Sequence, residues 1–256
     1  MEVHHHPIAI GSHTERRKWT HYFWEFLMLF LAVTLGFFVE NQREHFIENK
    51  REKQYIRSLI IDLKKDTTNA SLHLRRNISK FKGLDSLLNI LNSNKAFDSA
   101  VTVRLYRLLY AYGRSRALVI TNEITIQQLL SSGNVRLLRK KGVYDSLVSY
   151  QLRKSILIRL VPDYQDAYTK SFTYQAEIFK VRGYREILMN SDTSFTPVFT
   201  NNNLRFITTD RITLQKYVEA TEAWRSVISA YIGDLKILKR TAVDLLILVK
   251  KEYNLE

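Results

Sequence analysis

Few side chains in this sequence have the types and spacing that chemistry requires. Asp62 and Asp66 lie four residues apart, so their carboxylates could hold a cation on one helix face. Two lysines lie between them, which favours a solvated stripe of salt bridges instead. The histidines at 4–6 could ligate a transition metal, but they lie in a polar tail and the chain has no Cys. We therefore predict no metal site.

Catalytic motifs are also missing from the sequence. It contains no glycine-rich phosphate loop, no nucleophile elbow and no His-Glu-x-x-His pattern. An active site would have to be assembled from residues whose pattern is typical of a surface. We expect neither catalytic residues nor a cofactor, and we do not expect an enzyme.

Glu25 is the one acidic or basic residue inside a strongly apolar stretch, residues 22–39. An ionised carboxylate is costly in a bilayer, so this side chain should reach the interface, pair with a cation such as Lys18, or be protonated. An alternative is that several copies of Glu25 line a pore or a helix contact in an oligomer.

The apolar stretch itself organises the rest of the chain. At about 1.5 Å per residue it reaches about 27 Å, close to the ~30 Å hydrocarbon thickness of a bilayer. A cleaved signal peptide would have a shorter apolar region that ends in small residues. We predict an uncleaved membrane anchor over residues 19–40. Its ends carry aromatic side chains of the kind that lie near lipid headgroups: Trp19, Tyr22, Trp24, Phe37 and Phe38.

The orientation of this anchor is less clearly encoded, because cations lie on both sides of it. A basic cluster directly before the first apolar run is the arrangement of a signal anchor. We therefore expect residues 1–18 to form a short cytoplasmic tail, and residues 41–256 to form a periplasmic domain at a bacterial inner membrane.

Composition indicates that this domain is built from helices. Only 8 Gly and 3 Pro occur in 256 residues, and 45% of residues are hydrophobic. The formal net charge is +14, spread over short pairs of cations and not over one basic tract. This favours membrane lipid or an acidic protein partner, and makes nucleic acid an unlikely partner.

Two long stretches repeat apolar residues with alternating spacings of four and three. The first runs from Ile56 to Leu91 and the second from Leu214 to Val249. We predict an all-α fold in which one N-terminal transmembrane helix is followed by a long-helix, mostly antiparallel bundle. The residues expected at the bundle seam include Leu63, Leu74, Phe81, Leu88, Trp224, Ile228, Leu235 and Leu245.

Shorter elements should connect these two helices. A helix capped by Asp98 or Ser99 should end at Gly113. Residues 121–142 could form a helix-turn-helix DNA reader around Gly133, but the second helix would be short, which favours a packing corner.

A further helix should begin near residue 143, and Pro162 should break or kink it. Tyrosines along this helix should cover the edge of the core with their hydroxyls in water, and residues 190–209 should form a loop suited to partner contacts.

Four segments of the sequence together resemble a group of uncharacterised single-pass membrane proteins of Bacteroidota. They are the opening MEVHHHP, the anchor YFWEFLMLFLAVTLGFFVENQREH, the following REKQYIRSLIIDLKKDT and the later SSGNVRLL. The resemblance implies a natural His-rich start and an inner-membrane location. It implies no activity and no functional residue.

Our leading hypothesis is a membrane-anchored, non-enzymatic interaction or scaffold protein that forms an oligomer or binds a partner through its bundle. A second hypothesis is an extracytoplasmic ligand sensor that signals through a separate partner, because only about eighteen residues remain on the inner side. A third is a small oligomeric channel built around the single span.

Overall fold

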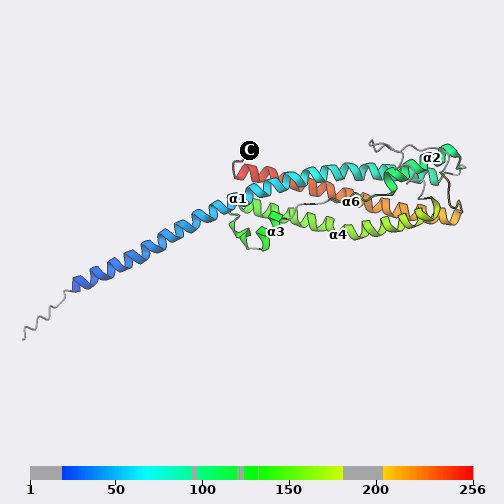
Figure 1. Ribbon diagram of the computed structural model, residues 1–256. Coiled ribbons are helices and arrows are strands. Elements are labelled where there is room, and N and C mark those ends of the chain that lie inside the picture. The colour runs from blue at the N-terminus through cyan, green and yellow to red at the C-terminus, as the bar shows by residue number, and fades with distance from the viewer. Residues whose placement is uncertain are drawn as a thin grey trace, which may run out of the picture. The chain divides into compact units, whose positions relative to one another are not determined.

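The computed structural model describes residues 19–93, 97–119, 121, 124–131, 133–180 and 204–255. Within these ranges the chain is helical and has no strand, apart from a single bridge between Phe179 and Phe206. The all-α prediction is confirmed (Figure 1). The helices are α1 (Trp19–Leu91), α2 (Ser99–Leu108), α3 (Ile124–Ser131), α4 (Lys141–Ile178) and α6 (Arg211–Glu252), with a π-helical turn η1 (Leu109–Gly113) and a 3-10 turn η2 (Asn134–Leu137).

Helix α1 contributes to two compact units, which divide after Lys53. The first unit, Met1–Lys53, contains an 18-residue window of α1 that is apolar and long enough to cross a membrane. None of this window is buried. The predicted apolar helix is therefore present near the N-terminus, and it is long and apolar enough to span a membrane.

The second unit, Gln54–Glu256, is a bundle of three long helices: α4, α6 and the part of α1 that follows Lys53. Helix α6 runs antiparallel to both neighbours (Figure 1): along α4, Ser171 meets Thr221 and the earlier Tyr164 meets the later Tyr231, and Arg225 contacts Asp85 of α1. Helices α1 and α4 are parallel. Two of the three pairings are antiparallel, so the mostly antiparallel arrangement is confirmed.

The 4,3 spacing of both long stretches corresponds to the buried face of each helix. On α6 it produces an almost continuous row of side chains with at most a few per cent exposure. On α1 it includes two polar positions, and one of them, Asn77, is fully buried. The apolar positions pack into one core, which supplies most of the hydrophobic stabilisation of the unit.

Local signals at the helix ends agree with the structure. Asp98 caps α2 by accepting a hydrogen bond from the backbone N of Val101 at 2.8 Å, and Asp210 caps α6 by accepting from the backbone N of Thr213 at 2.9 Å. Gly133 adopts a φ of 66°, the left-handed turn that glycine permits without strain.

Pro162 does not break α4, which continues from Lys141 to Ile178. Proline removes the backbone donor that would pair with the carbonyl of Ile158. Pro162 and Ile158 are both exposed, so water can satisfy this carbonyl. Of the two outcomes predicted for this residue, a break or a kink, the break does not occur, since the helix loses one hydrogen bond only on its solvent side.

Parallel α1 and α4 require the chain to return along the bundle between them. Residues 114–119, here called the crossover segment, make part of this return without regular secondary structure. Helix side chains satisfy its backbone: Asn77 Nδ2 donates to the Ala117 carbonyl at 2.6 Å, and the Val119 N donates to the Tyr231 hydroxyl at 2.9 Å. Ala117 is buried, and its carbonyl needs such a partner because this segment has no helical hydrogen bonds of its own.

Candidate functional site

The side chains predicted to anchor the protein are exposed on the first part of α1. Trp19 is 87% exposed, and Tyr22, Trp24, Phe37 and Phe38 are more than half exposed. Such a concentration of exposed aromatic and aliphatic side chains is unusual for a surface in water. It is the pattern expected of a helix whose surroundings are lipid.

Glu25 pairs with a residue that the sequence prediction did not select. His21 lies one turn earlier on α1, and its Nε2 is 3.0 Å from Glu25 Oε1. Lys18, the cation that the sequence suggested, lies outside the described residues. A partner one turn nearer the helix start would reduce the cost of placing a carboxylate in an apolar environment.

The residues predicted at the bundle seam lie in the core or at its margin. Six of them are almost fully buried: Leu63, Leu88, Trp224, Ile228, Leu235 and Leu245. Leu74 and Phe81 are half-buried and pack against this core. Phe81 also contacts the guanidinium of Arg225, whose carbon lies 4.8 Å from the ring centroid.

Asp62 and Asp66 do not form the solvated stripe that the sequence suggested. They are only 7% and 3% exposed. Asp66 accepts a hydrogen bond from the Tyr150 hydroxyl at 2.5 Å, and Asp62 accepts one from the backbone N of Thr125 at 3.3 Å. The two carboxylates therefore bind α4 and the start of α3 to α1, which is a structural role.

Two of the tyrosines on α4 also differ from their prediction. Tyr150 and Tyr164 are fully buried, and their hydroxyls bond to Asp66 and Asn77 instead of water. The sequence suggested the edge of the core because tyrosine commonly keeps its hydroxyl in solvent. Here polar residues of α1 supply the partners that make full burial possible.

The segment considered as a DNA reader is a packing corner. After Gly133 the chain makes only the four-residue turn η2, and Leu137 and Leu138 are buried. A recognition helix must present several exposed residues along a groove of DNA. A single 3-10 turn with buried leucines cannot do so.

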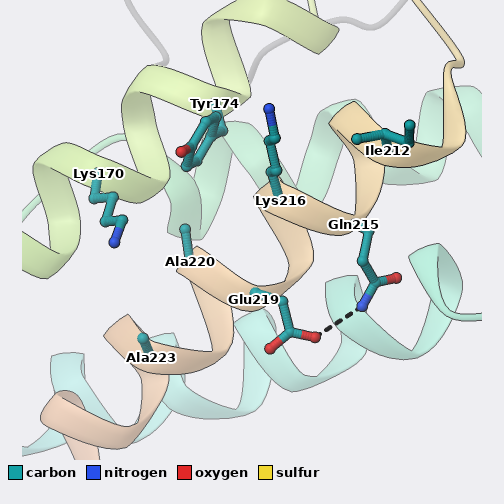
Figure 2. Close-up of a pocket in the computed structure, with 8 residues that line it drawn as sticks. All are labelled: Lys170, Tyr174, Ile212, Gln215, Lys216, Glu219, Ala220 and Ala223. Carbon is teal, nitrogen blue, oxygen red and sulfur yellow. Dashed lines mark hydrogen bonds between the residues drawn. The ribbon is translucent and has the colours of Figure 1, made fainter.

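One groove of about 470 Å³ lies between α4 and α6. Figure 2 shows Lys170 and Tyr174 from α4 facing a row of residues from α6, with Ala220 and Ala223 along the groove. Gln215 donates to Glu219 at 2.7 Å, so this groove contains a carboxylate beside its lysines. Its charge is mixed, which gives no preference for one kind of ion.

A second cavity, here called the basic pocket, has about 370 Å³ and a different character. Its described lining includes no carboxylate and three cations, Arg76, Lys80 and Arg116. The remaining lining residues are small, hydroxyl-bearing or aromatic: Ser79, Ala111, Tyr112, Ser115 and Ala117. Helix α1, the turn η1 and the crossover segment together form it.

Lys80 is the buried cation of this pocket, with 4% of its surface exposed. Its Nζ donates to the Tyr112 carbonyl at 2.8 Å and to Ser115 Oγ at 3.3 Å, and lies 5.3 Å from the ring centroid of Trp224. Burial lowers the pKa of Lys80 to about 8, because removal from water disfavours the charged amine.

The sequence pattern contained a signal for these buried polar residues that the seam analysis missed. Positions 59, 66, 73, 80 and 87 repeat every seven residues beside the seam, and hold Leu, Asp, His, Lys and Leu. A helix with two bundle neighbours buries a wider face than a two-helix seam requires. At this heptad position Asp66, His73 and Lys80 lie between Leu59 and Leu87, and this pattern could have indicated a buried row of polar residues.

Comparison with known proteins adds no further assignment. The chain matches no protein-family model, no curated protein and no solved structure.

Proposed function

We propose that this protein is a membrane-anchored helical interaction module whose bundle is held at a bacterial inner membrane by the N-terminal part of α1. The observation that carries this proposal is the apolar window of α1, none of which is buried. A soluble protein would normally cover such a segment with its own core. Lipid is the environment that best accommodates it.

The bundle offers a surface for a partner on α4. Tyr144, Val148 and Leu152 follow one another at intervals of four residues and are 39%, 46% and 55% exposed. Residues spaced in this way lie on one face of a helix. We call them the α4 stripe, and we propose that a second copy of the chain, which would present the same apolar face, is the first partner to test.

The anchoring part of the proposal is tested by placing two charges in the apolar window. Arginine near the centre of a span costs about 2.5 to 3.5 kcal/mol on insertion scales. We expect the Leu31→Arg, Leu35→Arg double variant to lose its resistance to alkaline extraction from membranes. The matched control, Ile61→Arg with Ile158→Arg, changes two residues of the bundle that are also about half exposed, and should remain in the membrane fraction. Complete extraction of the unaltered protein would refute the anchor.

Orientation is tested with reporters fused after residue 256. Alkaline phosphatase activity, without fluorescence from a green fluorescent protein fusion, is the result expected for a periplasmic bundle. Fluorescence without phosphatase activity would reverse the proposed orientation.

The partner surface is tested by cysteine crosslinking, since the chain has no native Cys. Single variants Val148→Cys and Leu152→Cys should form disulfide-linked dimers in membranes under mild oxidation. Arg153→Cys is the control because it is exposed and adjacent to Leu152, yet points about 100° away on the helix. Equal crosslinking at all three positions would argue against the α4 stripe as the contact.

A further inference from the structure

The basic pocket combines positive charge, one buried cation and a missing counter-charge. Arg76 and Lys80 are one turn apart on α1, so both reach the same cavity, and Arg116 enters it from the crossover segment. Within the described part of the chain, none of these three cations forms an ion pair with a carboxylate. We propose that the basic pocket binds a small organic anion through a phosphate or carboxylate group.

The buried position of Lys80 is the first argument. A charge removed from water is costly unless an opposite charge or strong hydrogen bonds compensate it. Lys80 has two hydrogen bonds and the Trp224 ring as partners, but all three are neutral. An anion in the pocket would supply the missing charge, and would favour the protonated amine that burial disfavours.

The types of donor in the pocket define the chemical class of the ligand. Arginine presents paired donors that match the oxygens of phosphate and carboxylate groups. Arg76 and Arg116 are both exposed and can adjust to a ligand, whereas Lys80 is buried. The Ser79 and Ser115 hydroxyls add polar groups that can donate to the same oxygens.

The size and remaining walls indicate a small molecule with an organic part. A volume of about 370 Å³ lies within the usual range for small-ligand pockets, ~300–1,000 Å³. Ala111 and Ala117 supply apolar contacts beside the charged group, and Tyr112 supplies a ring. The pocket lies wholly within the bundle unit, so this proposal does not depend on the anchoring function.

The groove between α4 and α6 provides a contrast within the same protein. Its two lysines, Lys170 and Lys216, share the groove with Glu219 and are not buried (Figure 2). An anion there would meet a carboxylate. This difference makes Lys170 a suitable control, because it is a lysine that lines a cavity without the proposed ligand chemistry.

Binding is tested on the full chain in a non-ionic detergent, with inorganic phosphate and phenyl phosphate as probes and sodium chloride at matched ionic strength as the reference. A ligand that binds only the folded state raises the unfolding temperature with its concentration. We expect both probes to raise this temperature beyond the effect of chloride. The stabilisation should grow with the logarithm of the probe concentration, as it does for a single binding site. Equal effects of chloride, phosphate and phenyl phosphate, together with no effect of anionic lipid, would overturn the proposal.

Two variants assign the effect to the pocket. Lys80→Met and Arg76→Gln should each weaken the apparent affinity at least about tenfold, because each removes a charge-assisted hydrogen bond donor. Lys170→Met should leave it unchanged. Arg76 is exposed, so Arg76→Gln remains a test if Lys80→Met fails to fold. Unchanged affinity in Arg76→Gln, and in Lys80→Met if it folds, would overturn the proposal.

A second arm of the experiment distinguishes a soluble anion from a lipid headgroup as the source of the anionic group. Stabilisation by free phosphate or phenyl phosphate in detergent alone supports a soluble ligand. Stabilisation only after addition of an anionic phospholipid to the micelles, lost in Arg76→Gln and kept in Lys170→Met, supports a lipid headgroup at the same pocket.

Discussion

Replacement of Lys80 by methionine should remove a specific pH dependence from the stability of the bundle. Burial lowers the pKa of Lys80 to about 8 in the folded chain, from an ordinary 10.5. Below pH 8 both the folded and the unfolded chain hold the proton, so the full cost of the buried charge opposes folding. Between pH 8 and 10.5 the folded chain has released the proton while the unfolded chain still holds it. The free energy of unfolding should therefore rise with pH in this window.

The magnitude follows from the two pKa values. Each pKa step corresponds to about 1.4 kcal/mol, so the whole effect is about 3 kcal/mol, and about 2 kcal/mol of it should appear between pH 7 and 9.5. Lys80→Met has no group that titrates here, so its free energy of unfolding should lack this rise. At a single pH the variant is less informative, because it also loses the hydrogen bonds to Tyr112 and Ser115.

Other ionisable groups in and around the basic pocket should contribute equally to both proteins. Burial raises the pKa values of the nearby tyrosines and lowers that of His73. The groups concerned are His73 and Arg76 from α1, Arg116 from the crossover segment, Tyr164 and Tyr168 from α4, and Tyr231 from α6. The difference between the two proteins therefore isolates Lys80.

Urea unfolding followed by tryptophan fluorescence can measure this difference. The chain has 3 Trp, of which Trp19 and Trp24 lie in the anchor and Trp224 contacts Lys80. A background with Trp19→Phe and Trp24→Phe leaves Trp224 as the only tryptophan reporter of the bundle. The free energy of unfolding should rise by about 2 kcal/mol from pH 7 to 9.5 in this background and stay nearly level once Lys80→Met is added. Parallel curves for the two proteins would refute the reasoning.

Two further predictions concern contacts of α1. Gly83→Ala should destabilise the bundle by about 1–3 kcal/mol in urea unfolding, because its new Cβ would overlap the Tyr112 ring. In the control Gly233→Ala the new Cβ meets nothing within 4 Å, so this variant should be neutral or stabilising. Equal urea midpoints for the two variants would mean that the Tyr112 ring moves aside without cost. Tyr150→Phe should lower the free energy of unfolding by about 1–3 kcal/mol, and its effect should couple with that of Asp66→Asn in a double-mutant cycle. Purely additive effects would contradict the hydrogen bond between these side chains.

Hydrophobic periodicity determined the helices, because burial of one face depends only on spacing along a helix. The row from Tyr217 to Val249 on α6 could be identified residue by residue for this reason. Caps such as Asp98 and Asp210 were also predictable, since the side chain and the backbone donor lie within one turn. The apolar window of α1 needed only length and composition.

Contacts between distant residues decided the basic pocket and the buried polar row. Lys80 and Ser115 are 35 positions apart, and Asp66 and Tyr150 are 84 apart, so no local pattern indicated that they meet. Their sequence neighbours suggested a solvated surface, as for Asp66 beside two lysines. Asp66 is buried where α4 packs parallel to α1, and Lys80 is buried by η1, the crossover segment and Trp224 of α6.

The sequence by itself determined the helical fold, the apolar segment of α1 and the heptad seams, because each depends on interactions within a few turns of one helix. The tertiary structure alone decided that residues 114–119, which have no regular secondary structure, pack against the bundle helices, and that the Tyr112 carbonyl of η1 and the Ser115 hydroxyl meet Lys80. The physical reason is that buried polar groups need partners, and those partners are supplied by whichever segments the topology brings together.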